Sequence, residues 1–420
     1  MSDLPVRLRP LASFEVLFVC FLFSGVFKAW APLAWVPVDL TALLATLTAL
    51  SGGWLLVRGF RPHRTGVVLS LLFGLFAGYA ALSLRWSPSG LYAGSKAFRL
   101  LTVTALSLVG AALVVSASRA RLRRAFATAG VLAAVATVET IRVGLSPGLP
   151  TPFGTNYLIV GRLIGFGAVL IAAVLLFDRP ELRYRVAGWT ALGGCLLALL
   201  LAGGRGPLTS TVVVVAGLAV VALVTGHASV PRDGRVVAAG VGGVALLGGV
   251  LLAVGEAIRG VRRFLLLLDG PGDSLGGRFA HYETAVDLWL SGSTLRGHGL
   301  GGWSVLVGDA DVQSYPHNLV LEILVELGVV GLALFALLVC AGVVALARGW
   351  VETGDPTSFA VAALFSFTFL NAAVTGDLNE NRFLFAAIGL LAYRPVDRIG
   401  PGTAPVAGNR PHAANPGVKR

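Results

Sequence analysis

The sequence predicts an all-α polytopic membrane protein with about twelve transmembrane helices and one long extracytoplasmic loop. Two observations lead to this fold class. Of the 420 residues, 56% are hydrophobic and only 13% are charged, a balance that soluble globular domains do not show. The apolar residues also gather in runs of about twenty, the length that a helix needs to cross a bilayer.

The apolar runs give the expected spans in order. The first, at 12–30, is interrupted by Lys28, and the last, at 383–394, is short. The others fall at 36–57, 66–84, 97–116, 125–143, 157–177, 186–203, 207–225, 236–256, 317–346 and 357–375. Arg7 and Arg9 precede the first run with no small-residue cleavage site, which predicts an uncleaved first span.

The basic residues predict the orientation. Most of the 33 Lys and Arg residues fall on one side, in RGFRPHR (58–64), SRARLRR (118–124), DRPELRYR (178–185), PRDGR (231–235) and the tail. Short basic loops mark the cytoplasmic side, so both termini are expected there and the loop at 257–316 outside. Orientation also explains the net charge of +12, and no nucleic-acid partner is expected, because no basic patch is interleaved with aromatic residues.

Four segments are expected along the chain. Spans one to nine occupy 1–256, the long periplasmic loop 257–316 and spans ten to twelve 317–394. A tail at 395–420, rich in Pro, Gly and Ala, is predicted to be disordered. The three cysteines lie in apolar runs without metal-ligand spacing, and no metal or other cofactor is predicted.

Two arginines belong to the expected outer face. Arg205, in LAGGRGPL, lies between two spans, where glycines permit a sharp turn and Pro207 suits the first turn of a helix. A helix N-terminus there favours anions. Residues 277–290 of the long loop predict an amphipathic helix that points Arg278 back over the spans. Its stripe consists of Arg278, Tyr282, Ala285 and Trp289. Taken singly, Arg205 is better explained as an interfacial arginine, and Arg278 is equally well explained as a solvated charge on a surface helix.

The segment YPHNLVLEILVELGVVG (315–331) places polar residues at the beginning of an apolar helix. A positive helix end disfavours imidazolium, so His317 is predicted to stay neutral, as a general base near pH 7 must. Asn318 follows it, and Glu322 and Glu326 lie four residues apart on the same helix. Ionisable groups in lipid are costly, so the two carboxylates need partners or a function.

Two further segments complete the outer face. TGDLNENR (375–382) supplies Asp377, which is expected to orient a base or to pair with an arginine, together with Glu380 and Arg382. GHGLGGW (297–303) lacks the Lys-Ser/Thr of a P-loop and predicts a sharp re-entry turn, with a backbone open to a lipid or sugar.

Arginines, a neutral histidine and a carboxylate on one face describe a site for a diphosphate and a hydroxyl nucleophile. Guanidinium groups bind phosphate oxygens bidentately, and the histidine can accept the hydroxyl proton. His317 is thus the predicted catalytic residue, and Arg205 and Arg278 bind the diphosphate. The supporting residues are Asp377, Asn318, Glu322, Arg382 and Tyr282.

With these motifs the chain resembles the O-antigen ligase and O-antigen polymerase superfamily of bacterial membrane glycosyltransferases. The resemblance spans roughly 155–390. It rests on NYLIVGR (156–162), GGRG (203–206), GGR (276–278), GHGLGGW, HNLVLEILVELGVVG (317–331) and GDLNENR (376–382). It implies a GT-C-like fold and a metal-independent enzyme of the cytoplasmic (inner) membrane with its site facing the periplasm.

Members of this superfamily move a glycan from a polyprenyl (undecaprenyl) diphosphate carrier to an acceptor hydroxyl. The acceptor is a lipid A-core sugar in ligases and the growing glycan in polymerases. By this resemblance His317 matches the catalytic histidine, Arg205 and Arg278 match the diphosphate-binding arginines, and Asp377 aligns more loosely.

The leading hypothesis is a ligase of lipopolysaccharide biosynthesis that inverts the anomeric carbon. An O-antigen or exopolysaccharide polymerase stays open, because both subfamilies share these motifs. The alternative of another class is a transporter or flippase of lipid-linked glycans, which Glu322 and Glu326 would suit best. Transporters, however, place functional charges near the midplane of the membrane, whereas these polar residues gather at one surface.

Overall fold

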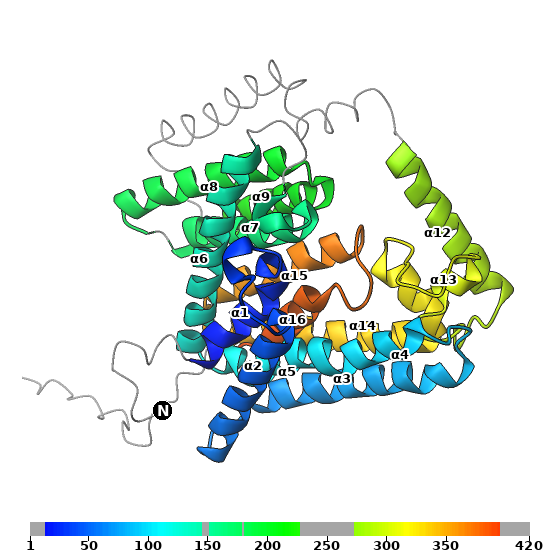
Figure 1. The fold of residues 1–420 in the computed structure, drawn as a ribbon. Helices are drawn as coiled ribbons and strands as arrows, with labels where there is room; N and C mark the ends of the chain where they lie inside the picture. Colours follow the sequence, from blue (N-terminus) through cyan, green and yellow to red (C-terminus); the bar gives the residue numbers. More distant parts are fainter. Residues whose placement is uncertain (1–12, 145–150, 179, 227–272, 395–420) are drawn as a thin grey trace, which may run out of the picture.

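The computed structural model describes residues 13–144, 151–178, 180–226 and 273–394, in which every regular element is a helix (Figure 1). The first half contains α1 (Phe14–Phe27), α2 (Leu40–Val57), α3 (Arg64–Leu82), α4 (Tyr92–Arg99), α5 (Ala105–Leu113), α6 (Arg119–Gly144), α7 (Tyr157–Ala173), α8 (Leu182–Ala202) and α9 (Arg205–Val224). The second half contains α12 (Asp273–Ser291), α13 (Trp303–Leu306), α14 (Leu319–Thr353), α15 (Thr357–Ala372) and α16 (Arg382–Leu390). Short 3-10 or π-helical turns are η1 (Ala31–Leu33), η2 (Ser83–Trp86), η3 (Leu100–Thr104), η4 (Val115–Ala117), η5 (Pro152–Gly154) and η6 (Val174–Asp178).

The helices confirm a multi-pass membrane protein. Eight helical stretches of the described residues are long and apolar enough to span a bilayer, and each coincides with an expected span. The expected spans at 12–30 and 357–375 correspond to the shorter apolar helices α1 and α15, and the one at 383–394 to the nine-residue α16. The expected span at 236–256 and the tail at 395–420 lie outside the described residues. The total of about twelve spans therefore stays a prediction.

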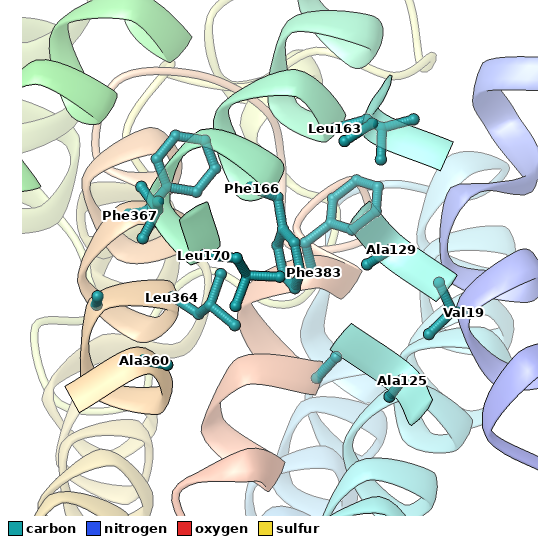
Figure 2. Packing of buried hydrophobic residues seen from close by; sticks show 14 of the residues in the cluster. Val19, Ala125, Ala129, Leu163, Phe166, Leu170, Ala360, Leu364, Phe367 and Phe383 are labelled. Carbon is teal, nitrogen blue, oxygen red and sulfur yellow. The ribbon is translucent and has the colours of Figure 1, made fainter. Parts of the chain in front are cut away.

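The core is built around α7, which belongs to the most buried of the candidate spans. Of the residues in the apolar window of that span, 78% are buried. Glycines let its neighbours approach closely: a side chain at Gly165 would meet the ring of Phe367 at 2.5 Å. Phe23 of α1 packs against Phe166 of α7, with ring centroids 5.5 Å apart, and against Phe383 of α16, at 5.0 Å. Figure 2 shows side chains of α7, α15 and α16 meeting in this cluster. This packing holds the first turns of α7 and α16 close to each other. These turns carry Arg162 and Arg382.

The expected span at 317–346 is not one continuous helix. Its backbone leaves the helical conformation at Gly328, where φ is 64° and ψ −166°. The GHGLGGW turn docks onto this break: the amide of Gly299 donates to the carbonyl of Glu326 at 2.7 Å, and the amide of Val329 donates to that of Thr294 at 3.0 Å. The glycines of the turn thus admit protein backbone, where the sequence suggested room for a lipid or sugar. Hydropathy cannot reveal such a break, because both halves of α14 are apolar.

The helix α12 and the short α13 lie beyond the end of the bundle at which α14 begins (Figure 1). The predicted stripe on α12 is confirmed by burial: Ala285 is buried, and Arg278, Tyr282 and Trp289 are half-buried among exposed neighbours. Ala285 packs with Trp303 and Val325, so this face of α12 covers α13 and the first turns of α14. The long loop therefore positions Arg278 beside the start of α14.

Candidate functional site

His317 lies in the last turn before α14, held by backbone and side-chain contacts. Its φ is 60°, a left-handed conformation that few non-glycine residues adopt and that histidine tolerates better than most. Asn318 caps the helix: its Oδ1 accepts hydrogen bonds from the amides of Val320, at 2.9 Å, and Leu321, at 3.2 Å. The cap fixes where the helix begins and so fixes the place of the imidazole, just outside the span.

The imidazole of His317 lies in a half-buried aromatic setting. Its ring is edge-on to Tyr315, with centroids 4.8 Å apart, and 5.9 Å from the ring of His281. Burial lowers the pKa of His317 below its usual value, and the positive charges of Arg278 and His281 lower it further. Nδ1 is buried and has no hydrogen-bond partner among the described residues. The structure thus brings Arg278 into electrostatic range of His317 and favours a neutral ring near pH 7.

Tyr282, on the same face of α12, approaches the same turn. Its hydroxyl donates a long hydrogen bond of 3.5 Å to the carbonyl of His317. This contact ties the helix that carries Arg278 to the turn that carries His317.

Arg205 is the first residue of α9, as the sequence predicts. Gly203 ends α8 with φ at 69°, and Pro207 follows in the first turn of α9. A side chain at Gly206 would lie 3.4 Å from Val374 and 4.0 Å from Thr375. Arg205 therefore lies beside the connection from α15 to α16, the segment that carries Asp377.

Asp377 is fully buried and accepts several hydrogen bonds. Oδ2 accepts from the hydroxyl of Tyr92 at 2.5 Å and from Nε2 of Gln313 at 3.2 Å. Oδ1 accepts from the backbone amides of Asn379, at 3.0 Å, and Glu380, at 2.7 Å. The carboxylate thus fixes the turn between α15 and α16 to α4 and to the segment before His317, and it makes no direct contact with an arginine in the described part of the chain.

Glu322 and Glu326 have a partner that sequence reasoning missed. Lys96 of α4 is fully buried, and its Nζ lies 2.5 Å from Oε1 of Glu322 and 2.7 Å from Oε2 of Glu326. Oε1 of Glu322 also accepts a hydrogen bond from the amide of Leu378 at 3.2 Å. The cost of burying these charges is offset by the pairing, which joins α4, α14 and the turn of Asp377. The i, i+4 glutamates indicated that a partner was needed, but not which one.

Residues 190–336 match the family model described as O-antigen ligase. This match confirms the resemblance to the O-antigen ligase and polymerase superfamily. It covers GGRG, GGR, GHGLGGW and the beginning of the His317 helix, whereas NYLIVGR and GDLNENR lie outside it. Members of the family are membrane glycosyltransferase-like enzymes. A comparison with curated proteins gives no match.

Arg382 lines a cavity together with Arg162 and Arg99, two arginines outside the prediction. Arg162 of α7 donates from Nη1 to the carbonyl of Glu380 at 3.3 Å, and Arg382 donates from Nη2 to the hydroxyl of Ser24 at 3.3 Å. Tyr315 and Glu380 also line the cavity, which has a volume of about 600 Å³. Arg162 is the last residue of NYLIVGR, a motif on which the resemblance rests, but it is not among the predicted site residues.

Two titratable groups of this region are shifted. Burial and the negative charges of Glu380 and Asp377 raise the pKa of Tyr315 to about 12. Burial, with the charge of Asp377, raises the pKa of Glu380 against the opposing effect of Arg162. Carboxylates in this turn therefore repel one another, and Asp377 and Glu380 share a donor in Gln313.

Within the described ranges, no cluster of three or more His, Cys, Asp or Glu side chains could hold a metal ion. The expected absence of a metal or other cofactor stays a prediction. Apart from Glu322, which pairs with Lys96, the predicted residues fall into two groups by their contacts. His317, Asn318, Arg278 and Tyr282 gather at the start of α14, and Arg205, Asp377 and Arg382 lie at or beside the turn between α15 and α16. Gln313 and Tyr315 join the groups, because they precede His317 and line the cavity with Glu380.

Proposed function

We propose that this protein transfers a glycan from a polyprenyl diphosphate carrier to a hydroxyl of lipid A-core, on the periplasmic side of the cytoplasmic membrane. The observation that carries the proposal is the placement of His317: a half-buried imidazole, biased towards its neutral form and within range of the charge of Arg278. The match to the O-antigen ligase family covers both residues and Arg205.

In the proposed reaction, a neutral ring nitrogen of His317 accepts the proton of the acceptor hydroxyl. The oxygen attacks the anomeric carbon from the side opposite the diphosphate. The bond between that carbon and the diphosphate oxygen breaks, so the configuration inverts. Arg205 and Arg278 stabilise the negative charge that develops on the leaving polyprenyl diphosphate.

The membrane setting follows from the same proposal. Both termini lie in the cytoplasm, the donor and acceptor are embedded among membrane lipids, and α12 covers the site from the periplasm. Glu322 and Glu326, which would suit a transporter, are engaged with Lys96 in the described structure, which supports a positioning role for them.

The experiment supplies purified protein with a polyprenyl diphosphate-linked glycan, no added metal, and two acceptors in separate reactions: lipid A-core and the lipid-linked glycan itself. Arg278→Ala is compared with Arg296→Ala, an exposed arginine of the same loop. Product on lipid A-core that is lost in Arg278→Ala and kept in Arg296→Ala supports the ligase. Elongated carrier-linked chains identify a polymerase, and translocation without bond formation identifies a transporter and contradicts the proposal.

A further inference from the structure

Two arginines at one end of the bundle, the buried Arg162 and the half-buried Arg382, lack a carboxylate partner within ion-pair distance in the described structure. Only 7% of Arg162 is exposed, its Nε is buried without a hydrogen-bond partner, and its guanidinium contacts the carbonyl of Glu380. Arg382 contacts the hydroxyl of Ser24. No Asp or Glu oxygen of the described residues lies within 4.0 Å of either guanidinium. Burying a cation without a close counter-ion is costly, so Arg162, with Arg382 lining the same cavity, predicts an anion that binds between them.

The space for such an anion is the 600 Å³ cavity that both side chains line. Its other basic residues are Lys28 and Arg99, and its acidic residues are Asp39 and Glu380. Lys28 is paired with Asp39. The pKa of Glu380 is raised, which weakens it as a counter-ion. The cavity walls therefore carry an excess of positive charge. The volume of the cavity is that of a small-molecule site.

The cavity also borders helices whose outer surface is apolar. It reaches α2 and the junction of α4 with η3. Of the candidate spans, α2 is the least buried, with 6% of the residues in its apolar window buried. At that junction the side chains of Phe98 and Leu101 are 68% and 50% exposed. In a bilayer these surfaces face lipid, so a ligand with an apolar tail has access to the cavity from the side.

We propose that Arg162 and Arg382 bind a phosphate or diphosphate group of a membrane-borne amphiphile in this cavity. The site differs from the pair Arg205 and Arg278, neither of which lines it. Its polar end reaches Gln313 and Tyr315, shortly before His317. The cavity thus provides a place for the phosphorylated head of one of the two lipid-borne substrates; that assignment, but not the anion site itself, rests on the proposed function.

The test measures dissociation constants of four probes with purified protein in uncharged detergent. The probes are undecaprenyl diphosphate, phosphorylated lipid A, phosphatidylglycerol and, as the uncharged reference, undecaprenol. Arg162→Gln and Arg382→Gln are compared with Arg85→Gln, an exposed arginine at the predicted outer end of α3. We expect each cavity variant to weaken at least one anionic probe by about tenfold or more, because charge-assisted contacts are lost. Undecaprenol binding and Arg85→Gln should be unchanged.

Arg162 also supports the turn at Glu380, so its variant could unfold for reasons unrelated to binding. Ala42→Trp, on the α2 wall of the cavity, fills the space and leaves both arginines in place. It should weaken the same anionic probe while the thermal stability stays near that of the unmodified protein. Unchanged binding of all three anionic probes in Arg382→Gln and in Ala42→Trp would overturn the proposal.

The probe that responds identifies the source of the phosphate. A loss confined to undecaprenyl diphosphate places the carrier of the donor in the cavity, a loss confined to lipid A places the acceptor there, and a loss confined to phosphatidylglycerol indicates a bilayer lipid. Because no transfer is measured, arginine-dependent binding without any transferase activity would reject the proposed function and leave the anion site standing.

Discussion

Replacing Lys96 tests whether the buried charges hold the site together. In Lys96→Met the side chain keeps a similar length, but two buried carboxylates lose the cation that lies 2.5 Å and 2.7 Å from them. Removing one partner of a buried ion pair costs about 3–5 kcal/mol, since the remaining charge stays buried without compensation. We expect a loss of that size in the free energy of unfolding, and lower abundance in the membrane.

The chain offers a matched control in Lys28, which pairs with Asp39 at an exposed position, with 57% and 41% of the two side chains accessible. Water screens such a pair, so Lys28→Met should cost about 0–1 kcal/mol. Both variants are measured by equilibrium unfolding in mixed micelles, followed by tryptophan fluorescence.

A third variant separates charge from packing. Combining Lys96→Met with Glu322→Gln and Glu326→Gln removes every charge of the cluster, so most of the lost free energy of unfolding should return. If Lys96→Met lowers the free energy of unfolding no more than Lys28→Met, or if the triple variant is less stable than Lys96→Met alone, the buried charges do not hold the site together.

Three further outcomes follow from the structure. Transfer measured against pH should rise as His317 loses its proton, with a midpoint below the usual histidine pKa of about 6.5, and His281→Ala should move that midpoint upward because a nearby positive charge is removed. Tyr92→Phe removes a 2.5 Å hydrogen bond to the buried carboxylate of the turn between α15 and α16, and should lower the free energy of unfolding by about 1–3 kcal/mol; an unchanged value would contradict the role given to this contact. In Gly328→Ala the new methyl would lie 2.3 Å from a backbone oxygen at a φ of 64°, so the midpoint of thermal unfolding should fall sharply, whereas Gly193→Ala, in open space on α8, should leave it nearly unchanged.

Much of the fold could be predicted from the local sequence. Runs of apolar residues predicted the eight long spans, since a helix that faces lipid must be apolar over its length. The start of α9 at Arg205 and of α14 just after Asn318 also followed from nearby residues, because glycine, proline and asparagine act within a turn of the helix end. The stripe on α12 was readable because burial follows the helical period.

Contacts between distant segments were not predictable from one sequence. Lys96 lies 226 residues before Glu322, and Ser24 lies 358 residues before Arg382. Neither contact could therefore be predicted from the residues around it. The break at Gly328 was missed for a related reason: the GHGLGGW turn that docks there precedes α14 in the chain, and both halves of α14 are apolar. Sequence therefore indicated which charged groups required partners, and the packing of the helices determined the partners.

Chemical rescue is the experiment that shows whether His317 acts as the general base. Because φ at position 317 is 60°, glycine suits the backbone there, and His317→Gly removes the imidazole without new strain. His317→Asn, which also tolerates this conformation, keeps a polar side chain that cannot accept the proton. Transfer to lipid A-core is measured for both variants at normal abundance, with and without free imidazole. We predict that both lose transfer and that imidazole restores part of it in His317→Gly alone; full transfer by either variant without imidazole would contradict the account.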